Sequence, residues 1–334
     1  MNRQFNVAVV GATGAVGIEM IKTLEKRKFP VKDLRLFASE RSKGKTLTYR
    51  GKELPVEVLT HDCFKGIEIA LFSAGGSRSK EFAPSAVKAG AVVIDNSSAF
   101  RMDPDIPLVV PEVNPEDIKK HHGIIANPNC STIIMNVPVW PLHQANPVKR
   151  IVVSTYQAVS GAGAWGLYEL DDQIKAYAAG QPIKKNKFPH QIVNNLFSHN
   201  SAVQANGYNE EENKMVNETR KIFHCADMLI SATCVRVPVP RAHTEAINLQ
   251  FSKPMPVAKA REILGKAPGV KIIDDPAKNH FPMPMEASDQ YDVLVGRIRQ
   301  DPSQPKNYGL DLLVSGDQLL KGAALNAVQI AELL

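Results

Sequence analysis

Cysteine is scarce in this chain, which has four cysteines among 334 residues and no C-x-x-C pair. No histidine stands near any of them at a spacing typical of a zinc site, so the sequence predicts no bound metal. So small and scattered a set also argues against a disulfide framework, and we expect free thiols. The four are Cys63, Cys130, Cys225 and Cys234.

Long apolar runs are lacking as well. The longest candidate, residues 133–142, contains Pro138 and Pro141 and falls well short of the roughly 20 residues that a membrane span needs. The first five residues carry one basic side chain and no apolar core, which argues against a secretory signal. We therefore expect a cytoplasmic protein with no membrane partner.

Aromatic residues make up only 6% of the chain, and its basic residues are dispersed rather than interleaved with aromatics. That pattern argues against nucleic-acid binding. The formal net charge of +6 suits anionic small molecules instead. The densest basic cluster, residues 184–187, is interpreted as an exposed loop.

The length and the hydrophobic content of 44% predict two domains. In the first part, short apolar runs alternate with helical spacing, which predicts an α/β fold: a Rossmann-like parallel sheet that binds a dinucleotide. The expected strands are residues 5–10, 34–39, 67–72 and 91–95, and the expected helices are 18–27 and 80–89.

Beyond about residue 130 the strand-like runs are longer and richer in β-branched residues, which predicts an α+β domain with a largely antiparallel sheet. These runs are residues 150–159, 229–239, 244–252 and 292–299. Residues 318–334 have the spacing of a helix that could pack back on the first domain. The expected domains are residues 1–129 with 316–334, and residues 130–315.

Gly11, Gly14 and Gly17 follow the first strand and open the first helix. In this context glycines allow a tight turn, and the helix N-terminus directs N–H groups at a pyrophosphate. The simpler alternative to dinucleotide binding is that these glycines only allow the chain to turn tightly. After the second strand, Arg41 suits the 2′-phosphate of NADP, whereas Glu40 would suit NAD; the basic residues outnumber it, so we expect NADP.

Cys130 lies in the hexapeptide Asn-Pro-Asn-Cys-Ser-Thr of residues 127–132, directly before an apolar stretch. Asn-Pro favours a turn, and Ser or Thr before an apolar run is typical of a helix start. The positive end of a helix stabilises a thiolate, so Cys130 is a candidate nucleophile. A lone cysteine is more often a small buried apolar residue, and the other motifs have to decide between the two.

Taken together, the motifs resemble those of the aspartate-semialdehyde dehydrogenase family over nearly the whole chain. The matching segments are residues 11–17, 95–101, 127–132, 157–163, 210–214, 236–239 ahead of His243, and 315–319. The resemblance implies NADPH-dependent, reversible reduction of 4-phospho-L-aspartate to L-aspartate 4-semialdehyde and phosphate through a cysteine thioester. It also implies a role in lysine, threonine, methionine and diaminopimelate biosynthesis, and a homodimer with the second domain at the interface.

The resemblance gives each site residue a role. Cys130 is the nucleophile, His243 the base, and Gln157 the residue that orients the acyl group. For the substrate, Arg236 matches the α-carboxylate clamp and Glu211 the partner of the α-ammonium group, with Glu210 as the plausible misassignment. The remaining substrate positions, for phosphate, are Arg101, Lys214 and Asn129. The cofactor positions are Gly11, Thr13, Gly14, Ala15, Val16, Arg41, Ser42, Ser160, Gly161 and Gln318.

Two other functions remain open at this point. An N-acetyl-γ-glutamyl-phosphate reductase has a similar cofactor turn, cysteine and acyl-phosphate chemistry, but its acetylated amine needs no acidic partner such as Glu211. A catalytically silent NADP-binding regulator could keep the fold without the chemistry. Against that regulator, Cys130, His243, Arg236 and Arg101 are all present.

Overall fold

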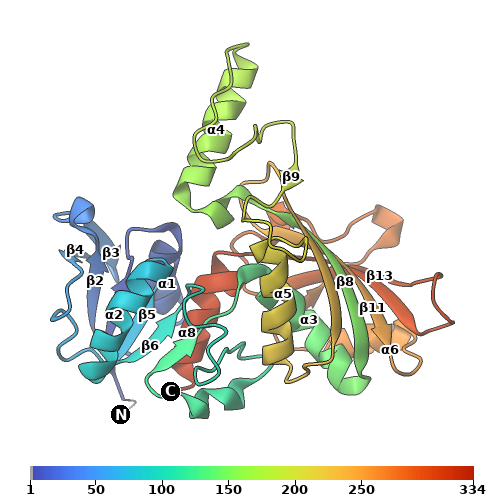
Figure 1. Cartoon of the computed structure of the whole chain (residues 1–334), viewed down its shortest axis with the longest axis horizontal. Coiled ribbons are helices and arrows are strands. Elements are labelled where there is room, and N and C mark those ends of the chain that lie inside the picture. The colour runs from blue at the N-terminus through green and yellow to red at the C-terminus, as the bar shows by residue number, and fades with distance from the viewer. Residues whose placement is uncertain (1–2) are drawn as a thin grey trace. The chain divides into compact units, whose positions relative to one another are not determined.

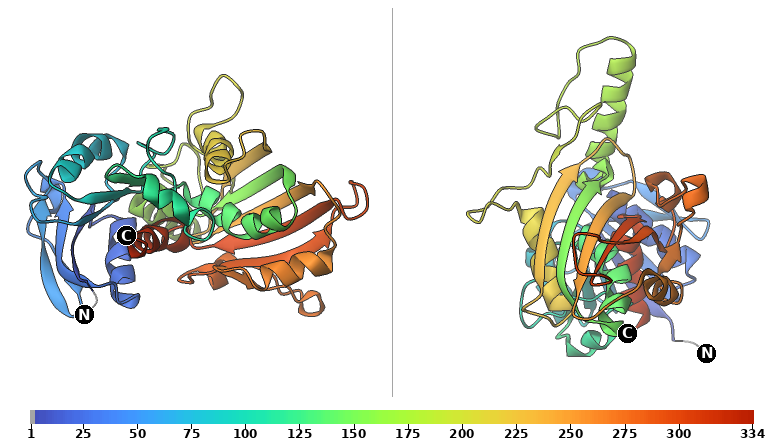
Figure 2. Two further views of the ribbon diagram at one scale, coloured as in Figure 1. Left: turned by 90° about the horizontal axis from the view of Figure 1, so that it is seen from below. Right: turned by 90° about the vertical axis from the view of Figure 1, so that its right-hand side faces the viewer.

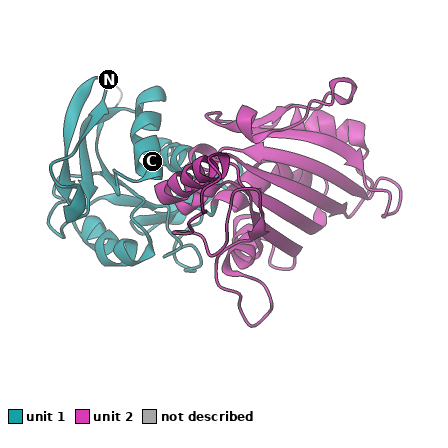
Figure 3. Cartoon of the chain, turned by 90° about the horizontal axis from the view of Figure 1, so that it is seen from above, with its two compact units in different colours: residues 1–129, 323–334 teal, residues 130–322 magenta. Residues whose placement is uncertain are grey.

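The computed structural model describes residues 3–334, which form two compact units (Figure 3). Unit 1 contains the chain up to Asn129 together with residues 323–334, and unit 2 contains residues 130–322. Met1 and Asn2, part of the segment judged above for a secretory signal, lie outside the described residues. Among residues 3–334, no helix combines the length and apolar character that crossing a bilayer would require.

Unit 1 is built on a seven-stranded sheet in the order β3-β4-β2-β1-β5-β6-β7, with helices on its faces (Figure 1). Every neighbouring pair is parallel except β3 and β4. The predicted parallel sheet is therefore confirmed. Its strands are β1 (Phe5–Val10), β2 (Val31–Ala38), β3 (Thr46–Tyr49), β4 (Lys52–Val58), β5 (Ile69–Phe72), β6 (Val92–Asp95) and β7 (Ile124–Ala126).

The central strand β1 explains why this sheet is covered on both sides. Val7 and Val9 belong to a core that includes residues of α1 (Ala15–Lys26) and α8 (Leu325–Glu332). Ala8 and Val10 belong to a second core, with residues of α2 (Gly76–Lys88). Because alternate side chains of a strand point to opposite faces, an unbroken apolar run is what a doubly covered parallel strand requires.

The end of the chain differs from the sequence-based prediction of one helix over residues 318–334. Residues 318 and 319 form a turn, Leu320–Ala324 winds as a π-helix, and the regular helix α8 begins only at Leu325. Gly322 passes so close to the nucleophile candidate that a Cβ added there would lie 2.8 Å from the Cβ of Cys130. Helical spacing alone does not reveal such a local widening, which is frequent at functional sites.

Unit 2 contains a second seven-stranded sheet, in the order β12-β13-β14-β11-β8-β10-β9 (Figure 2). The pairs β8–β10 and β12–β13 are parallel and the other four are antiparallel, so the predicted largely antiparallel sheet is confirmed. Its strands are β8 (Val148–Gln157), β9 (Phe197–Ser198), β10 (Leu229–Arg236), β11 (His243–Phe251), β12 (Val270–Ile272), β13 (Val293–Gln300) and β14 (Gly309–Gly316).

The two faces of this second sheet differ in burial. Side chains alternate strictly along β11 between buried and half-buried, and the helices α3, α5 and α6 pack on the buried face (Figure 2). In Figure 3 the strands of the other face are seen without a helix laid across their middle. The helices of unit 2 are α3 (Cys130–Ala145), α4 (Ala164–Ala178), α5 (Glu210–Ile222), α6 (Val257–Leu264) and α7 (Pro284–Ala287).

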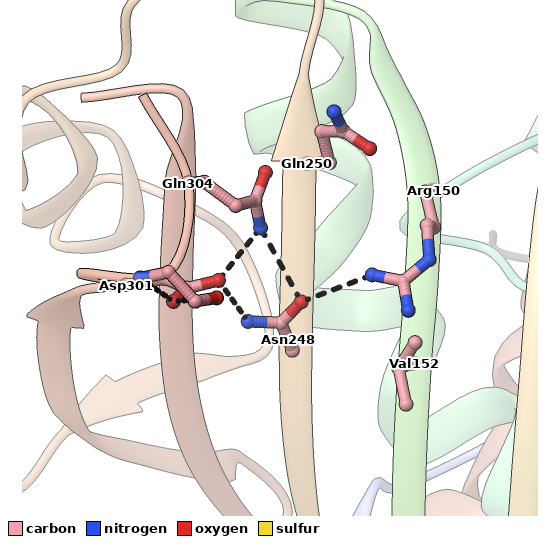
Figure 4. Close-up of a pocket in the computed structure, with 7 residues that line it drawn as sticks. Arg150, Val152, Asn248, Gln250, Asp301 and Gln304 are labelled. Carbon is pink, nitrogen blue, oxygen red and sulfur yellow. Dashed lines mark hydrogen bonds between the residues drawn. The ribbon is translucent and has the colours of Figure 1, made fainter. Parts of the chain in front are cut away.

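The half-buried face carries a hollow of about 410 Å³ floored by β8 and β11. Figure 4 shows Asn248 at its centre, between Arg150 and Asp301. The amide of Asn248 donates to Asp301 and to Asp311 over 2.8 Å each, and its oxygen accepts from Arg150 at 3.5 Å. This is a polar cluster on an otherwise mixed surface, far along the strands from the side chains described next.

Candidate active site

Three candidate site residues lie at one edge of the unit 2 sheet, where β10 and β8 end and β11 begins. Arg236 of β10 pairs with Gln157 of β8, and the β8–β11 register brings His243 beside Gln157. All three side chains are at most 2% exposed and point to the helix-covered face. The register thus gathers an arginine, an amide and an imidazole that stand far apart in the sequence.

We call Arg236, Gln157 and His243 the catalytic row. Helix α3 begins at Cys130 and brings this residue to the row. The predicted helix start is therefore confirmed, and the thiol lies where the helix dipole favours negative charge. Its Sγ is 3.4 Å from Nε2 of His243. A sulfur and an imidazole in hydrogen-bond contact form the arrangement of an activated cysteine nucleophile.

The hydrogen bonds of His243 define which ring nitrogen carries the proton. The backbone N–H of Ala158 donates to Nδ1 over 3.0 Å, so Nδ1 is an acceptor. In a neutral ring the proton is then on Nε2, the nitrogen that faces Cys130. Burial, followed by the charge of Arg236, lowers the pKa of His243 to about 3, so the ring is neutral at physiological pH.

Gln157 links the nucleophile segment to α5. Its Nε2 donates to Oγ of Ser131 at 2.6 Å and to Oε1 of Glu211 at 3.2 Å. Its Oε1 has no hydrogen-bond partner among the described residues although the side chain is 1% exposed. A buried amide oxygen of this kind is available to a bound ligand, because leaving it unpaired costs free energy.

The guanidinium of Arg236 is buried, and one of its three nitrogens has no hydrogen-bond partner among the described residues. Its Nη1 donates to the carbonyl of Ala158 and its Nη2 lies against Nε2 of His199, each over 2.7 Å. Its Nε has no hydrogen-bond partner in the described part of the chain. Because burying an incompletely paired cation is costly, this N–H indicates an anionic ligand.

Gly161 leaves no room for a side chain beside Arg236 and His243. A Cβ added there would lie 3.2 Å from Nη1 of Arg236 and 3.2 Å from Cε1 of His243. The backbone therefore approaches the catalytic row more closely than a larger residue would allow. The neighbouring Ser160 donates to the carbonyl of Pro240 over 2.6 Å.

Gln318 braces the loop that precedes His243. Its Oε1 accepts from the N–H of Ala242 over 2.7 Å, and its Nε2 donates to Oγ of Ser160. Ala242 has a positive φ of 69°, an unusual conformation that this bond helps to hold. In this structure the Gln318 amide therefore positions backbone next to the imidazole.

The three adjacent glutamates at the start of α5 have different surroundings. Glu210 is exposed, and Glu212 forms a capping box with Asn209. Glu211 is 5% exposed; one of its oxygens faces Gln157 and the other pairs with Nζ of Lys214 at 3.2 Å. Of the two alternatives left open by the sequence, Glu211 is the one that lies in the cluster with Gln157.

The glycine turn lies in unit 1, at the carboxyl end of β1. A Cβ on Gly11 would lie 2.3 Å from the carbonyl oxygen of Ser73, and one on Gly17 would lie 2.3 Å from that of Gly11. The helix α1 begins right after Gly14, with Ala15 and Val16 in its first turn. This cradle fits the pyrophosphate of a dinucleotide, because the backbone is bare and the helix N-terminus is open.

The loop after β2 meets this turn. Oγ1 of Thr13 and Oγ of Ser42 lie 3.1 Å apart, Arg41 is exposed beside them, and Glu40 is engaged by Lys43 at 3.1 Å. Two hydroxyls and an exposed arginine therefore lie in the loop after the second strand, which is where a Rossmann-like fold binds the adenosine ribose.

Arg101 and Asn129 also belong to unit 1, and both are less than 10% exposed. Nε of Arg101 donates to the carbonyl of Asn127 over 2.9 Å, and Nη2 donates to that of Asn96 over 2.8 Å. These bonds hold the guanidinium against Asn127, the first residue of the hexapeptide that contains Cys130. Lys214, the other expected phosphate ligand, belongs to unit 2.

Sequence reasoning missed His199, Ser131 and Glu245. Glu245 follows His243 by two positions on β11 and so shares its buried face; burial raises its pKa well above the usual range. Ser131 stood inside the hexapeptide without an assigned role. His199 lies in an irregular segment, where no sequence pattern predicted that its side chain is part of the site. Among residues 3–334 no group of three or more metal-ligating side chains is arranged to hold an ion, and none of the four cysteines takes part in a disulfide.

Comparison with known proteins agrees with this arrangement. Residues 6–121 match the family described as "Semialdehyde dehydrogenase, NAD binding domain", and residues 139–321 match "Semialdehyde dehydrogenase, dimerisation domain". The aspartate-semialdehyde dehydrogenase of Synechocystis sp. is 57% identical over 100% of this chain and 98% of its own. The crystal structure of aspartate semialdehyde dehydrogenase II of Vibrio cholerae complexed with ASA has a TM-score of 0.97 at 46% identity, covering 100% of this chain and 98% of that one.

A more distant structure, the aspartate semialdehyde dehydrogenase of Candida albicans with NADP, has a TM-score of 0.75 at 25% identity, with 99% and 98% of the two chains covered. Fold, cysteine–histidine pair and family matches together define a dinucleotide-dependent semialdehyde dehydrogenase. Within that class, the chain belongs to the aspartate-semialdehyde dehydrogenase family.

Proposed function

We propose that this chain catalyses the reversible, NADPH-dependent reduction of 4-phospho-L-aspartate to L-aspartate 4-semialdehyde and phosphate. The observation that carries the proposal is the 3.4 Å contact between Sγ of Cys130 and Nε2 of His243 at the start of a helix. Acyl phosphates and aldehydes both require a nucleophile that attacks easily and also leaves well, and a thiolate meets both demands.

The covalent steps centre on Cys130. Its thiolate attacks the acyl carbon, the C–O bond to phosphate breaks, and an aspartyl thioester and free phosphate result. NADPH held at the glycine turn of residues 11–17 would supply a hydride to the thioester carbon, and a thiohemiacetal anion on Cys130 would result. The collapse of this anion breaks the C–S bond, releases the aldehyde and restores the thiolate. Between thioester and aldehyde no proton is gained or lost.

His243 holds a proton at Nε2 beside these reacting atoms. We assign it first as a hydrogen-bond donor, to the sulfur and then to the negatively charged oxygen of the tetrahedral intermediates. The general-base role expected from the sequence requires the proton on Nδ1 instead, opposite the N–H of Ala158. That tautomer forfeits the Ala158 bond, so base catalysis by His243 comes at the cost of this contact.

Substrate recognition is assigned to the rest of the row. Arg236 binds the α-carboxylate, for which a buried guanidinium is suited, and Glu211 accepts from the α-ammonium group. Gln157 lies between Ser131 and Glu211 and orients the acyl group. For phosphate we propose Arg101, Lys214 and the amide of Asn129.

The proposed cofactor is NADP(H). Gly11, Gly14 and the start of α1, with Thr13, Ala15 and Val16, form the pyrophosphate cradle, and the 2′-phosphate is assigned to Arg41 and Ser42. Ser160 and Gly161 are assigned to the nicotinamide end. Any contact from Gln318 uses a group other than its amide oxygen, which is engaged by Ala242.

The direct test of this function is phosphate-dependent reduction of NADP with aspartate semialdehyde. We expect turnover with phosphate, none without it beyond a single turnover, and a preference for NADP over NAD. N-Acetylglutamate semialdehyde should react poorly, because its acylated amine carries no positive charge to pair with Glu211. Turnover with the acetylated substrate alone would indicate the reductase alternative, and cofactor binding without activity on either would indicate the silent regulator.

Arg41→Ala is expected to weaken NADP binding by about 10- to 100-fold, the worth of a charge-assisted hydrogen bond, and to leave NAD binding within about twofold. Fluorescence titration of both cofactors measures this. Lys52→Ala removes an equal charge from an exposed position on β4 and serves as the control. Equal NADP affinity in Arg41→Ala and Lys52→Ala would refute the assignment.

We further propose a homodimer through the half-buried face of the unit 2 sheet. The description of the matching family as a dimerisation domain supports a second copy as the occupant. Half-buried Val152 and 41%-exposed Tyr156 of β8 lie on this face, and Val152 pairs with Asn248 of the polar cluster. In a two-fold symmetric dimer, this patch of one copy would contact the same patch of the second copy.

Val152→Asp is expected to shift the protein from dimer to monomer at micromolar concentration, because it buries an unpaired charge in the proposed interface. Sedimentation velocity measures the change. Leu334→Asp, at the exposed C-terminus, is the control and should remain dimeric. An unchanged dimer in Val152→Asp would place the interface elsewhere.

A further inference from the structure

His199 stands against the substrate-binding arginine although no sequence motif contains it. Its Nε2 lies 2.7 Å from Nη2 of Arg236, and its Nδ1 lies 3.0 Å from Oγ of Ser201. Its backbone is fixed as well, because the His199 N–H donates to the carbonyl of Cys234 over 2.8 Å. Cys234 is on β10, the strand that carries Arg236.

The short contact to Arg236 determines the form of the imidazole. A guanidinium has only donors, so Nε2 must accept and the proton of the neutral ring is on Nδ1. The opposite tautomer would let Nδ1 accept from the N–H of Ser201, 3.2 Å away, but would set two donors 2.7 Å apart at Arg236. Burial lowers the pKa of His199 to about 4; the charges of Arg236 and Lys214 also lower it, against Glu211, which raises it.

The same chain of bonds continues to the other side of the substrate site. Nδ1–H of His199 donates to Oγ of Ser201, and that oxygen also accepts from the backbone N–H of Glu211 over 3.2 Å. His199 and Ser201 therefore connect Arg236 with the helix turn that carries Glu211. Within this path the guanidinium keeps Nε, which has no partner among the described residues, for a ligand.

We infer that His199 is a positioning residue for substrate recognition: its neutral imidazole holds Arg236 in the orientation that binds the α-carboxylate and ties it through Ser201 to Glu211. This inference rests on the proposed function, because it takes Arg236 and Glu211 as the ligands of the substrate's charged groups. Without the acceptor, a buried arginine adopts other orientations, and the substrate must supply the energy to order it.

The test compares His199→Ala with His199→Gln, whose amide oxygen can reach the position of Nε2. We expect His199→Ala to raise the KM for aspartate semialdehyde about tenfold, as for loss of a hydrogen bond to a charged group. The KM for phosphate and the affinity for NADP should stay within about twofold, and His199→Gln should recover most of the loss. His190→Ala removes an exposed histidine from the same segment and is the control.

A second substrate separates positioning from a general structural role. 3-Aminopropanal lacks the α-carboxylate, so its kcat/KM should be equal in the wild type and in His199→Ala. Should His199→Ala fail to fold, Ser201→Ala tests the same path, with an expected rise of about threefold in the same KM. An unchanged KM for aspartate semialdehyde, or an equal loss with both aldehydes, would overturn the inference. Absence of wild-type activity with aspartate semialdehyde would instead reject the proposed function.

Discussion

Replacing Cys130 with alanine is expected to abolish turnover in both directions, by at least about 10⁴-fold in kcat. The reason is chemical: without the sulfur no thioester forms, and hydride transfer has no covalent acyl group to act on. Cys130 is also the residue whose Sγ contacts His243, so no other thiol of the chain can replace it. Initial rates with aspartate semialdehyde, phosphate and NADP measure the loss.

The control for this variant is another cysteine. Cys225 lies just after α5 and is half-buried, and Cys225→Ala should keep kcat within about twofold. NADP titration should give nearly the same affinity for Cys130→Ala and wild type, because the glycine turn is untouched. Appreciable semialdehyde oxidation by Cys130→Ala would refute the nucleophile assignment.

His243→Asn is expected to lower kcat by about 10²- to 10⁴-fold while the protein stays folded. The asparagine oxygen can still accept from the N–H of Ala158, but no atom reaches the sulfur as Nε2 does. The variant therefore removes the reacting nitrogen and keeps the structural bond. Steady-state kinetics and thermal unfolding measure the two effects separately.

His243→Ala is the companion variant, since it loses the Ala158 contact as well. If Nε2 carries the effect, both variants should lose kcat to a similar extent, and only His243→Ala should also lose stability. A His243→Asn enzyme with near wild-type kcat would show that the imidazole is not needed for the chemistry.

Local patterns carried the prediction of unit 1. An apolar run, a glycine turn and a helical repeat are adjacent in sequence, and β1, the turn at Gly11 and α1 follow in that order. The helix start at Cys130 was equally local, because turn and cap signals precede it directly. In each case short-range preferences and tertiary packing agree.

The assembly of the row could not be derived from such patterns. Arg236, Gln157 and His243 meet because β10, β8 and β11 pair in one register, and register depends on contacts between distant segments. A family resemblance could name these residues, but only the pairing explains how they come together. β14, which adjoins β11, was not predicted as a strand either.

His199 marks the limit of sequence reasoning. It follows the two-residue strand β9, where neither a helical nor an alternating pattern exists to predict a buried face. Its importance emerges only from a 2.7 Å contact to an arginine on a neighbouring strand. Residues that orient other residues leave little trace in a motif, because their function is defined by geometry.

The central claim is that the aspartyl group is carried on Cys130, and a phosphate-free rapid-mix experiment tests it most directly. With aspartate semialdehyde and NADP but no phosphate, the account predicts a burst of one NADPH per chain, and peptide mapping should locate the aspartyl adduct on Cys130. Adding phosphate should release the adduct and start steady turnover. No burst, or a burst with the adduct on another residue, would contradict the account.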